Sequence, residues 1–163
     1  MTAASYRDGV SLRNGLRAIG QSFVARGRAT RSELTSALIL AGLAEALLFL
    51  VIHFFHPPTA PGLTVLWRRV AFEQSLALLP LVPLIGIGVR RLHDVGVSAV
   101  PGILLALIAL ASDLNQQLAA IGLHEGIPMP AWAGPIALLI LAVALFWSPS
   151  AGANRFGPDP RTR

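Results

Sequence analysis

The residues with the greatest capacity for chemistry form one short stretch, Arg90-Arg91-Leu92-His93-Asp94, between two long apolar runs. It holds two guanidinium groups, an imidazole and a carboxylate. Arginine binds phosphate or carboxylate through a planar fork of N–H donors, and an aspartate beside it can fix the orientation of that fork. The stretch therefore predicts either an anion-binding site or an Arg–Asp network that ties segments together.

Two further polar blocks contain residues of the same types, one before the first long apolar segment and one in the Gly- and Pro-rich tail. A compact helical bundle would bring all three blocks together. We expect these blocks to add the ligand contacts Arg28, Arg31, Asn154 and Arg155, and the structural partners Glu33 and Asp159.

The elements that must position these residues are strongly apolar. The chain has 163 residues, of which 54% are hydrophobic and 13% charged, whereas soluble domains carry about 25% charged residues. This composition indicates a membrane protein. The absence of cysteine excludes disulfides, thiolate nucleophiles and thiolate metal sites.

Four apolar segments predict an all-α polytopic membrane protein, a four-helix transmembrane bundle with an N-terminal amphipathic helix. We predict one membrane domain over residues 1–163, with helices at about 37–55, 70–89, 97–112 and 131–147. A segment at 1–35 and a tail at 148–163 flank them. Pro80 and Pro83 predict a kink in the second helix, and Thr30 or Ser32 is positioned to cap the first.

The amphipathic helix is predicted from Leu12, Leu16, Ile19 and Phe23, which recur at three- and four-residue spacing. Such a helix is expected to lie in the membrane interface beneath its arginines. A solvent-exposed N-terminus is the alternative.

The distribution of arginine predicts the orientation of the bundle. Four spans place both termini on one side, where eleven arginines fall, against only Arg68 and Arg69 on the other. Because cytoplasmic loops accumulate basic residues, we expect both termini in the cytoplasm. The net charge of +5 follows from this bias, so we expect no nucleic-acid partner. All basic side chains are arginine and Ala, Leu, Gly and Pro are abundant, which indicates a bacterial source and hence the inner membrane.

The sequence gives little support to the hypotheses that the protein is an enzyme or binds a metal. His93-Asp94 is similar to the His-Asp pair of metal-dependent phosphohydrolases, but such sites need several further ligands. His53, His56 and His124 are predicted on the opposite side of the membrane, so we expect no metal and no cofactor. General acid–base catalysis by His93 stays open, but without a partnered nucleophile we do not expect an enzyme.

Glu45 lies near the middle of the first predicted span, where an ionisable group is costly. It is either a hydrogen-bonded group within the bundle or part of a proton or cation path. The second reading supports an alternative function, a small oligomeric transporter or channel.

Taken together, the blocks Arg26–Glu33, Arg90–Ser98 and Gly152–Pro160 resemble the signature of domain-of-unknown-function family 805, over about residues 23–160. The resemblance implies a small bacterial inner-membrane protein and no particular activity. We expect a non-enzymatic binding or interaction module whose arginine-rich cytoplasmic face engages an anionic headgroup, a phosphate-bearing solute or a partner protein. Its expected partners are membrane lipids, anionic ones included, and either further copies of itself or another membrane protein.

Overall fold

The computed structural model describes residues 9–24, 26–55, 79–120 and 129–162. Within these residues the chain forms five α-helices and no strand, which confirms the all-α fold class. Residues 70–78 of the second predicted span, together with Arg68, Arg69, His56 and His124, lie outside the described residues.

Two of the described helices are long and apolar enough to cross a membrane, over Arg31–Ile52 and Ala99–Gln116. The helix Ala133–Phe146 is apolar but shorter. The predicted second span is described only from residue 79 onward. The arrangement of the whole chain as four membrane spans therefore stays a prediction.

The described chain divides into two compact units. Unit 1 comprises residues 1–25 and 32–87, and unit 2 comprises residues 26–31 and 88–163. The short arginine-rich segment 26–31 thus belongs with the end of α4 and the tail, although unit 1 flanks it in sequence. The prediction of a single membrane domain remains a prediction.

Unit 1 begins with the predicted amphipathic helix, α1 (Leu12–Gly20). Ser11 caps it, because its hydroxyl accepts a 3.2 Å hydrogen bond from the Asn14 amide. Gly15 packs closely against α2 (Arg31–Phe55): a Cβ there would lie 2.9 Å from the Ser36 carbonyl oxygen. The Ser11 amide also donates to the Ser36 hydroxyl at 3.1 Å. These contacts fix α1 on α2 through small and polar groups.

Helix α2 starts at Arg31, earlier than the predicted span at 37, because hydropathy marks the apolar part of a helix rather than its first turn. Thr30 directly precedes it and is buried, at the position expected of a capping residue. Further along, Pro80 lies in the 3₁₀ turn η1 (Leu79–Leu81). Pro83 lies in the first turn of α4 (Val82–Val95), where a missing N–H is tolerated.

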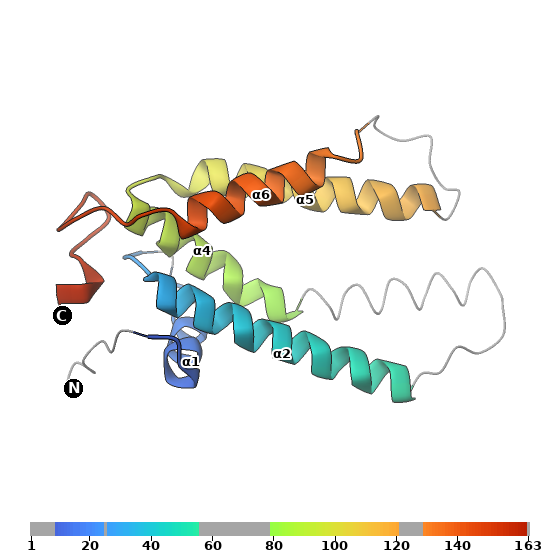
Figure 1. Ribbon diagram of the computed structural model, residues 1–163, viewed down its shortest axis with the longest axis horizontal. Helices are drawn as coiled ribbons and strands as arrows, with labels where there is room; N and C mark the ends of the chain where they lie inside the picture. The colour runs from blue at the N-terminus through green and yellow to red at the C-terminus, as the bar shows by residue number, and fades with distance from the viewer. Residues whose placement is uncertain (1–8, 25, 56–78, 121–128, 163) are drawn as a thin grey trace. The chain divides into compact units, whose positions relative to one another are not determined.

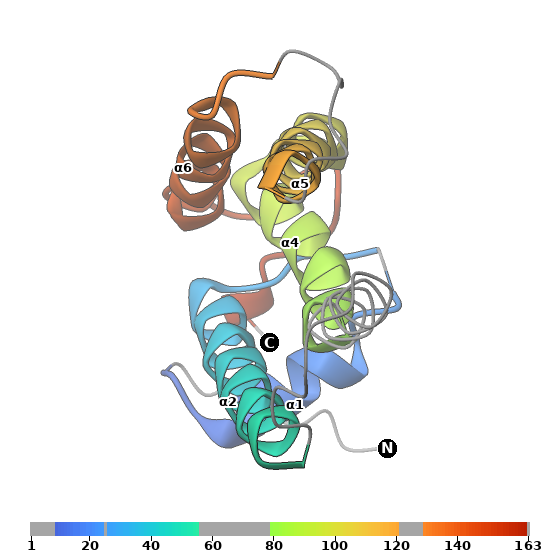
Figure 2. The ribbon, with the colours of Figure 1, turned by 90° about the vertical axis from the view of Figure 1, so that its right-hand side faces the viewer.

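Unit 2 contains α5 (Ala99–Ala120) and α6 (Ala133–Phe146), which lie side by side (Figures 1 and 2). They approach through small residues: the Gly134 amide donates to the Ser112 hydroxyl at 3.2 Å, and a Cβ on Gly134 would meet that side chain at 2.9 Å. Leu107 and Leu138 instead point outward and are exposed. Small residues inside and large apolar residues outside are typical of helices that pack in lipid.

The connection between α4 and α5 is shorter than the sequence suggested. Residues 90–95 are the last turns of α4, and the helix ends at Val95, before Gly96, whose φ of +89° suits glycine. The Val97 amide donates to the Leu92 carbonyl at 3.0 Å and the Gly96 amide to that of His93 at 3.1 Å. This pair of bonds is a Schellman motif, which satisfies the last carbonyls of α4.

Candidate functional site

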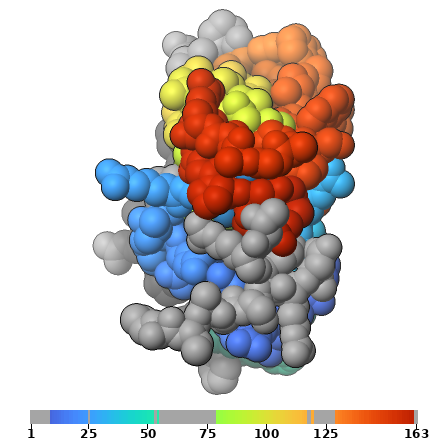
Figure 3. All heavy atoms as spheres, turned by 90° about the vertical axis from the view of Figure 1, so that its left-hand side faces the viewer, coloured from blue at the N-terminus to red at the C-terminus, as the bar shows by residue number. Residues whose placement is uncertain are grey.

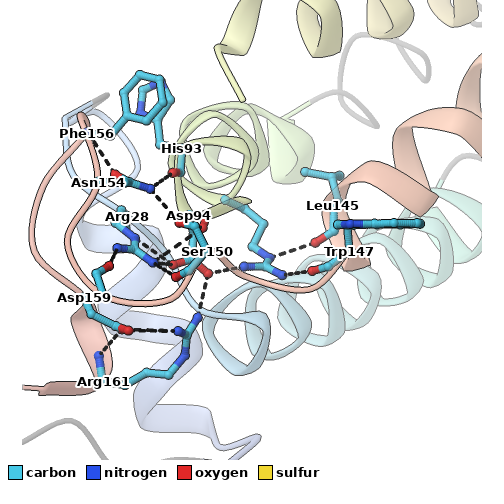
Figure 4. Close-up of polar contacts among 12 residues, drawn as sticks. Arg28, His93, Asp94, Leu145, Trp147, Ser150, Asn154, Phe156, Asp159 and Arg161 are labelled. Carbon is cyan, nitrogen blue, oxygen red and sulfur yellow. Dashed lines mark hydrogen bonds and ion pairs between the residues drawn. The ribbon is translucent and has the colours of Figure 1, made fainter. Parts of the chain in front are cut away.

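The centre of the site is the carboxylate of Asp94, which is fully buried near the end of α4 (Figure 4). One of its oxygens, Oδ1, accepts from Arg28 Nε at 2.8 Å. The other, Oδ2, accepts from Arg91 and from the Arg161 guanidinium, the latter at 2.8 Å. Three arginines from three separate segments thus share one carboxylate, and the three predicted blocks meet here.

Arg28 is the member contributed by the N-terminal block, and its side chain is fully buried. Besides Asp94, its guanidinium donates to two backbone carbonyls of the tail, that of Gly152 and that of Ser150, the latter at 2.8 Å. The adjacent Ala29 amide donates to the Arg90 carbonyl at 3.0 Å, which fixes the segment along the end of α4. Arg28 therefore joins the N-terminal block to both α4 and the tail.

Arg91 lies on α4 itself, three residues before Asp94, and is also fully buried. Its Nε donates to the Leu145 carbonyl at 2.7 Å, and its NH2 group donates to the Trp147 carbonyl at 2.6 Å. These two carbonyls lie at the C-terminal end of α6, where helix carbonyls have no intrahelical donor. Burial lowers the pKa of Arg91 from its ordinary value, while Asp94 opposes that shift. The guanidinium thus links α4 to the end of α6.

The tail folds back onto the end of α4 through Ser150 and Asn154 (Figures 3 and 4). Ser150 binds the Asp94 backbone carbonyl twice, through its amide and its hydroxyl, each at 2.9 Å. The Asn154 side-chain amide donates to the His93 carbonyl at 2.9 Å and to the Ser150 hydroxyl at 2.8 Å. Asn154 and Gly157 pair through their backbones, which closes a tight turn in the tail.

We call the residues joined in this way, Arg28, Arg91, Asp94, Ser150 and Asn154, the Asp94 clasp. Arg161 lies at its edge with its side chain 32% exposed, and it also pairs with Asp159 at 3.2 Å. The clasp buries the charged side chains of Arg28, Arg91 and Asp94. The two guanidinium groups pair with the carboxylate and donate hydrogen bonds to nearby backbone carbonyls. Such a network defines the position of the tail against the end of α4.

Beside the clasp, His93 and Phe156 stack face to face, with ring centroids 4.0 Å apart and planes inclined by 6°. The guanidinium carbon of Arg155 lies 4.7 Å from the Phe156 centroid, a cation–π distance. Burial lowers the pKa of His93 below its ordinary value, and the positive charge of Arg155 lowers it further, while the Gly27 backbone acts in the opposite direction. Arg155 itself is exposed.

The chain matches one protein family, described as "Protein of unknown function (DUF805)", over residues 22–158. The matched region includes most of the chain, the first two polar blocks and the third block as far as Pro158. The chain belongs to the DUF805 family. No curated protein and no solved structure matches it.

The structure of this DUF805 protein places the predicted site residues in different surroundings. Arg28, Arg91, Asp94 and Asn154 are drawn into the clasp, whereas Arg31 and Arg155 are exposed. Three further predicted residues lie elsewhere: Arg90 is buried on α4, Glu33 is buried in the first turn of α2, and Glu45 is half-buried farther along α2.

Sequence reasoning missed one member of the Asp94 clasp and several groups that bond to it. Arg161 lies beyond the family match, which ends at residue 158, and it was not among the predicted site residues. The carbonyls of Leu145, Trp147 and Gly152 leave no trace in the sequence, because any residue supplies one. Ser150 had a usable signal, a small hydroxyl residue directly after an apolar helix and a proline.

The described residues contain no group of three or more His, Cys, Asp or Glu side chains arranged to hold a metal ion. The Ser150 hydroxyl donates to a backbone carbonyl, and the His93 ring is stacked on Phe156. The arrangement of this DUF805 site is that of a network of ion pairs and hydrogen bonds.

Proposed function

We propose that this DUF805 protein is a four-span bacterial inner-membrane protein that acts as a non-enzymatic binding module. Its ligand is an anion with phosphate chemistry, held at the cytoplasmic face by arginines outside the Asp94 clasp. The two described helices long enough to cross a membrane and the outward-facing large apolar residues support membrane insertion. The arginine bias supports the cytoplasmic position of the blocks.

The observation that carries this proposal is the division between buried and exposed arginines. Arg28 and Arg91 donate to Asp94 and to tail or α6 carbonyls, so their N–H groups are used within the protein. Arg31 and Arg155 are exposed in the same unit. The clasp therefore acts as the rigid support, and the exposed arginines act as the binding groups.

The charge of this region favours an anionic ligand. Around the clasp, Arg28, Arg91 and Arg161 face Asp94 and Asp159, which leaves one net positive charge. The exposed Arg26, Arg31 and Arg155 add to it. Each basic residue near an anionic leaflet contributes about 1 kcal/mol of attraction. An anionic headgroup and a phosphate-bearing solute share the chemistry that these side chains recognise.

Native mass spectrometry of the purified full chain tests the proposal with three probes: phosphatidylglycerol, phosphatidylcholine and inorganic phosphate. We expect phosphatidylglycerol to be retained over phosphatidylcholine, and Arg155→Gln to weaken that retention by about fivefold. A phosphate adduct lost in Arg155→Gln, without a preference between the two lipids, would assign the site to a solute.

Arg68→Gln is the matched control, because it removes the same charge on the predicted opposite side of the membrane. It should leave retention unchanged. Equal retention of both lipids, no phosphate adduct and no effect of Arg155→Gln would contradict the proposed function.

A further inference from the structure

Helix α1 carries three distinct stripes along its length. Its buried stripe consists of Asn14, Gly15 and Ala18, which pack on the protein. Leu12 and Leu16, one turn apart, form a second stripe and are 65% and 57% exposed. Arg13 and Arg17, also one turn apart and exposed, form the third. Leu12 and Leu16 thus face away from the protein, Ile19 is half-buried, and the small or uncharged residues of the first stripe face inward.

Two further large apolar side chains are exposed just past the end of the helix. Phe23, the last residue of the turn that follows α1, is 83% exposed, and Val24 is 55% exposed. Leu12, Leu16, Phe23 and Val24 are thus four large apolar side chains exposed within one short segment, and apolar exposure of this kind marks an interaction surface rather than a solvated face.

This surface is built on a fixed support. At one end, Gly15 lies so close to Ser36 of α2 that a Cβ would meet its carbonyl oxygen at 2.9 Å. At the other end, the Ser22 carbonyl oxygen occupies the place of a Cβ on Gly86, 1.6 Å from where that atom would be. Backbone-to-backbone packing at both ends holds the outward stripe in a defined orientation.

The charges beside the stripe identify its occupant. Between Gly9 and Val24 the sequence contains two arginines and no acidic residue. Apolar side chains flanked by arginines match the boundary between acyl chains and anionic headgroups, where a short amphipathic helix lies parallel to the membrane. We propose that the outer face of α1, formed by Leu12, Leu16, Phe23 and Val24 with Arg13 and Arg17, docks on the anionic surface of the lipid bilayer.

The absence of cysteine allows a direct test in the full chain, because a single introduced cysteine carries an environment-sensitive fluorophore. Leu16→Cys and Arg17→Cys variants are labelled and placed in bilayer nanodiscs of phosphatidylcholine, with or without phosphatidylglycerol. Spin labels attached to the lipid acyl chains serve as quenchers. We expect the label at position 16 to be blue-shifted and quenched, and the label at position 17 to remain near water.

A variant with Arg13→Gln and Arg17→Gln, in the Leu16→Cys background, tests how much the two positive charges contribute to docking. Losing two basic residues should reduce the docking equilibrium constant on anionic bilayers by about thirtyfold, with little change on phosphatidylcholine. Both arginines are exposed, so the packing of α1 on α2 is retained, and circular dichroism checks this.

Two results would overturn the proposal. In one, the label at position 16 reports water in both bilayers. In the other, it is blue-shifted but not quenched by the spin-labelled lipid, which means that a protein or a second copy covers the face. The labelled residues belong to unit 1 and Arg155 to unit 2, so this test and the lipid-retention test can fail independently.

Discussion

Asp94→Asn should destabilise the attachment of the tail more than any other single change in the clasp. The substitution keeps the shape of the side chain but removes its charge. It leaves Arg28 and Arg91, both with fully buried side chains, without their shared counter-ion. Breaking a buried ion pair by removing one partner costs about 3–5 kcal/mol, because the remaining charge stays desolvated.

The matched control is Arg161→Gln, which removes the third arginine bound to Asp94. Its side chain is 32% exposed, so water screens the pair and its loss should cost about 0–1 kcal/mol. The two variants remove the same kind of interaction at the same carboxylate. Asp94→Asn also removes the Arg161 pair, so the difference between the two variants reports the cost of leaving the two buried guanidinium groups without a counter-ion.

Trypsin provides the assay, because Arg155 lies exposed in the tail next to the clasp. If cleavage requires the tail to open, a loss of 3–5 kcal/mol raises the cleavage rate at Arg155 by about a hundredfold to several thousandfold. Arg161→Gln should raise it less than about tenfold. If Asp94→Asn and Arg161→Gln are cleaved at similar rates, the buried-charge reasoning is wrong.

Three further changes have defined outcomes. The lowered pKa of His93 means that the unfolded chain binds a proton at a higher pH than the folded chain. Tail stability should therefore be full above about pH 6.5 and fall below it, and His93→Phe, which keeps an aromatic ring, should flatten that slope in tryptic cleavage measured across pH. Gly86→Ala should lower the free energy of unfolding by about 1–3 kcal/mol in thermal unfolding, because a Cβ has no room beside Ser22. An equally or more stable variant would refute the close packing of Gly86 on Ser22. Gly96→Ala should cost about 1–2 kcal/mol through its φ of +89°, and an unchanged melting temperature would contradict the helix-end geometry.

Much of the fold follows from hydropathy and residue spacing. The amphipathic helix α1 was predicted from Leu12 and Leu16, and the apolar runs gave α2, α5 and α6. The helix ends were not predicted well, since hydropathy marks where apolar residues stop and a helix can continue. Helix α5 runs to Ala120 through polar residues that tolerate helical conformation, although the predicted span ended at 112.

The sequence brought Arg28, Arg91 and Asp94 together through the charge of their blocks, and the structure joins them by ion pairs. Their role in binding a ligand stays a prediction. Whether a guanidinium faces a ligand or a carbonyl depends on the path of the tail. That path is set by the Ser150 and Asn154 hydrogen bonds, which involve backbone groups that every sequence has. The sequence therefore could not separate the buried arginines from the exposed ones.

The central claim is that exposed arginines beside the clasp bind a phosphate-bearing anion, and its lipid form is tested most directly by locating anionic lipid next to these side chains. A fluorophore on Ala153→Cys, an exposed position two residues before Arg155, serves as donor to headgroup-labelled lipid in nanodiscs that hold the full chain. We predict stronger energy transfer to phosphatidylglycerol than to phosphatidylcholine, and loss of that difference in Arg155→Gln combined with Arg31→Gln. Equal energy transfer to the two lipids, in the Ala153→Cys variant that keeps both arginines, would contradict the claim.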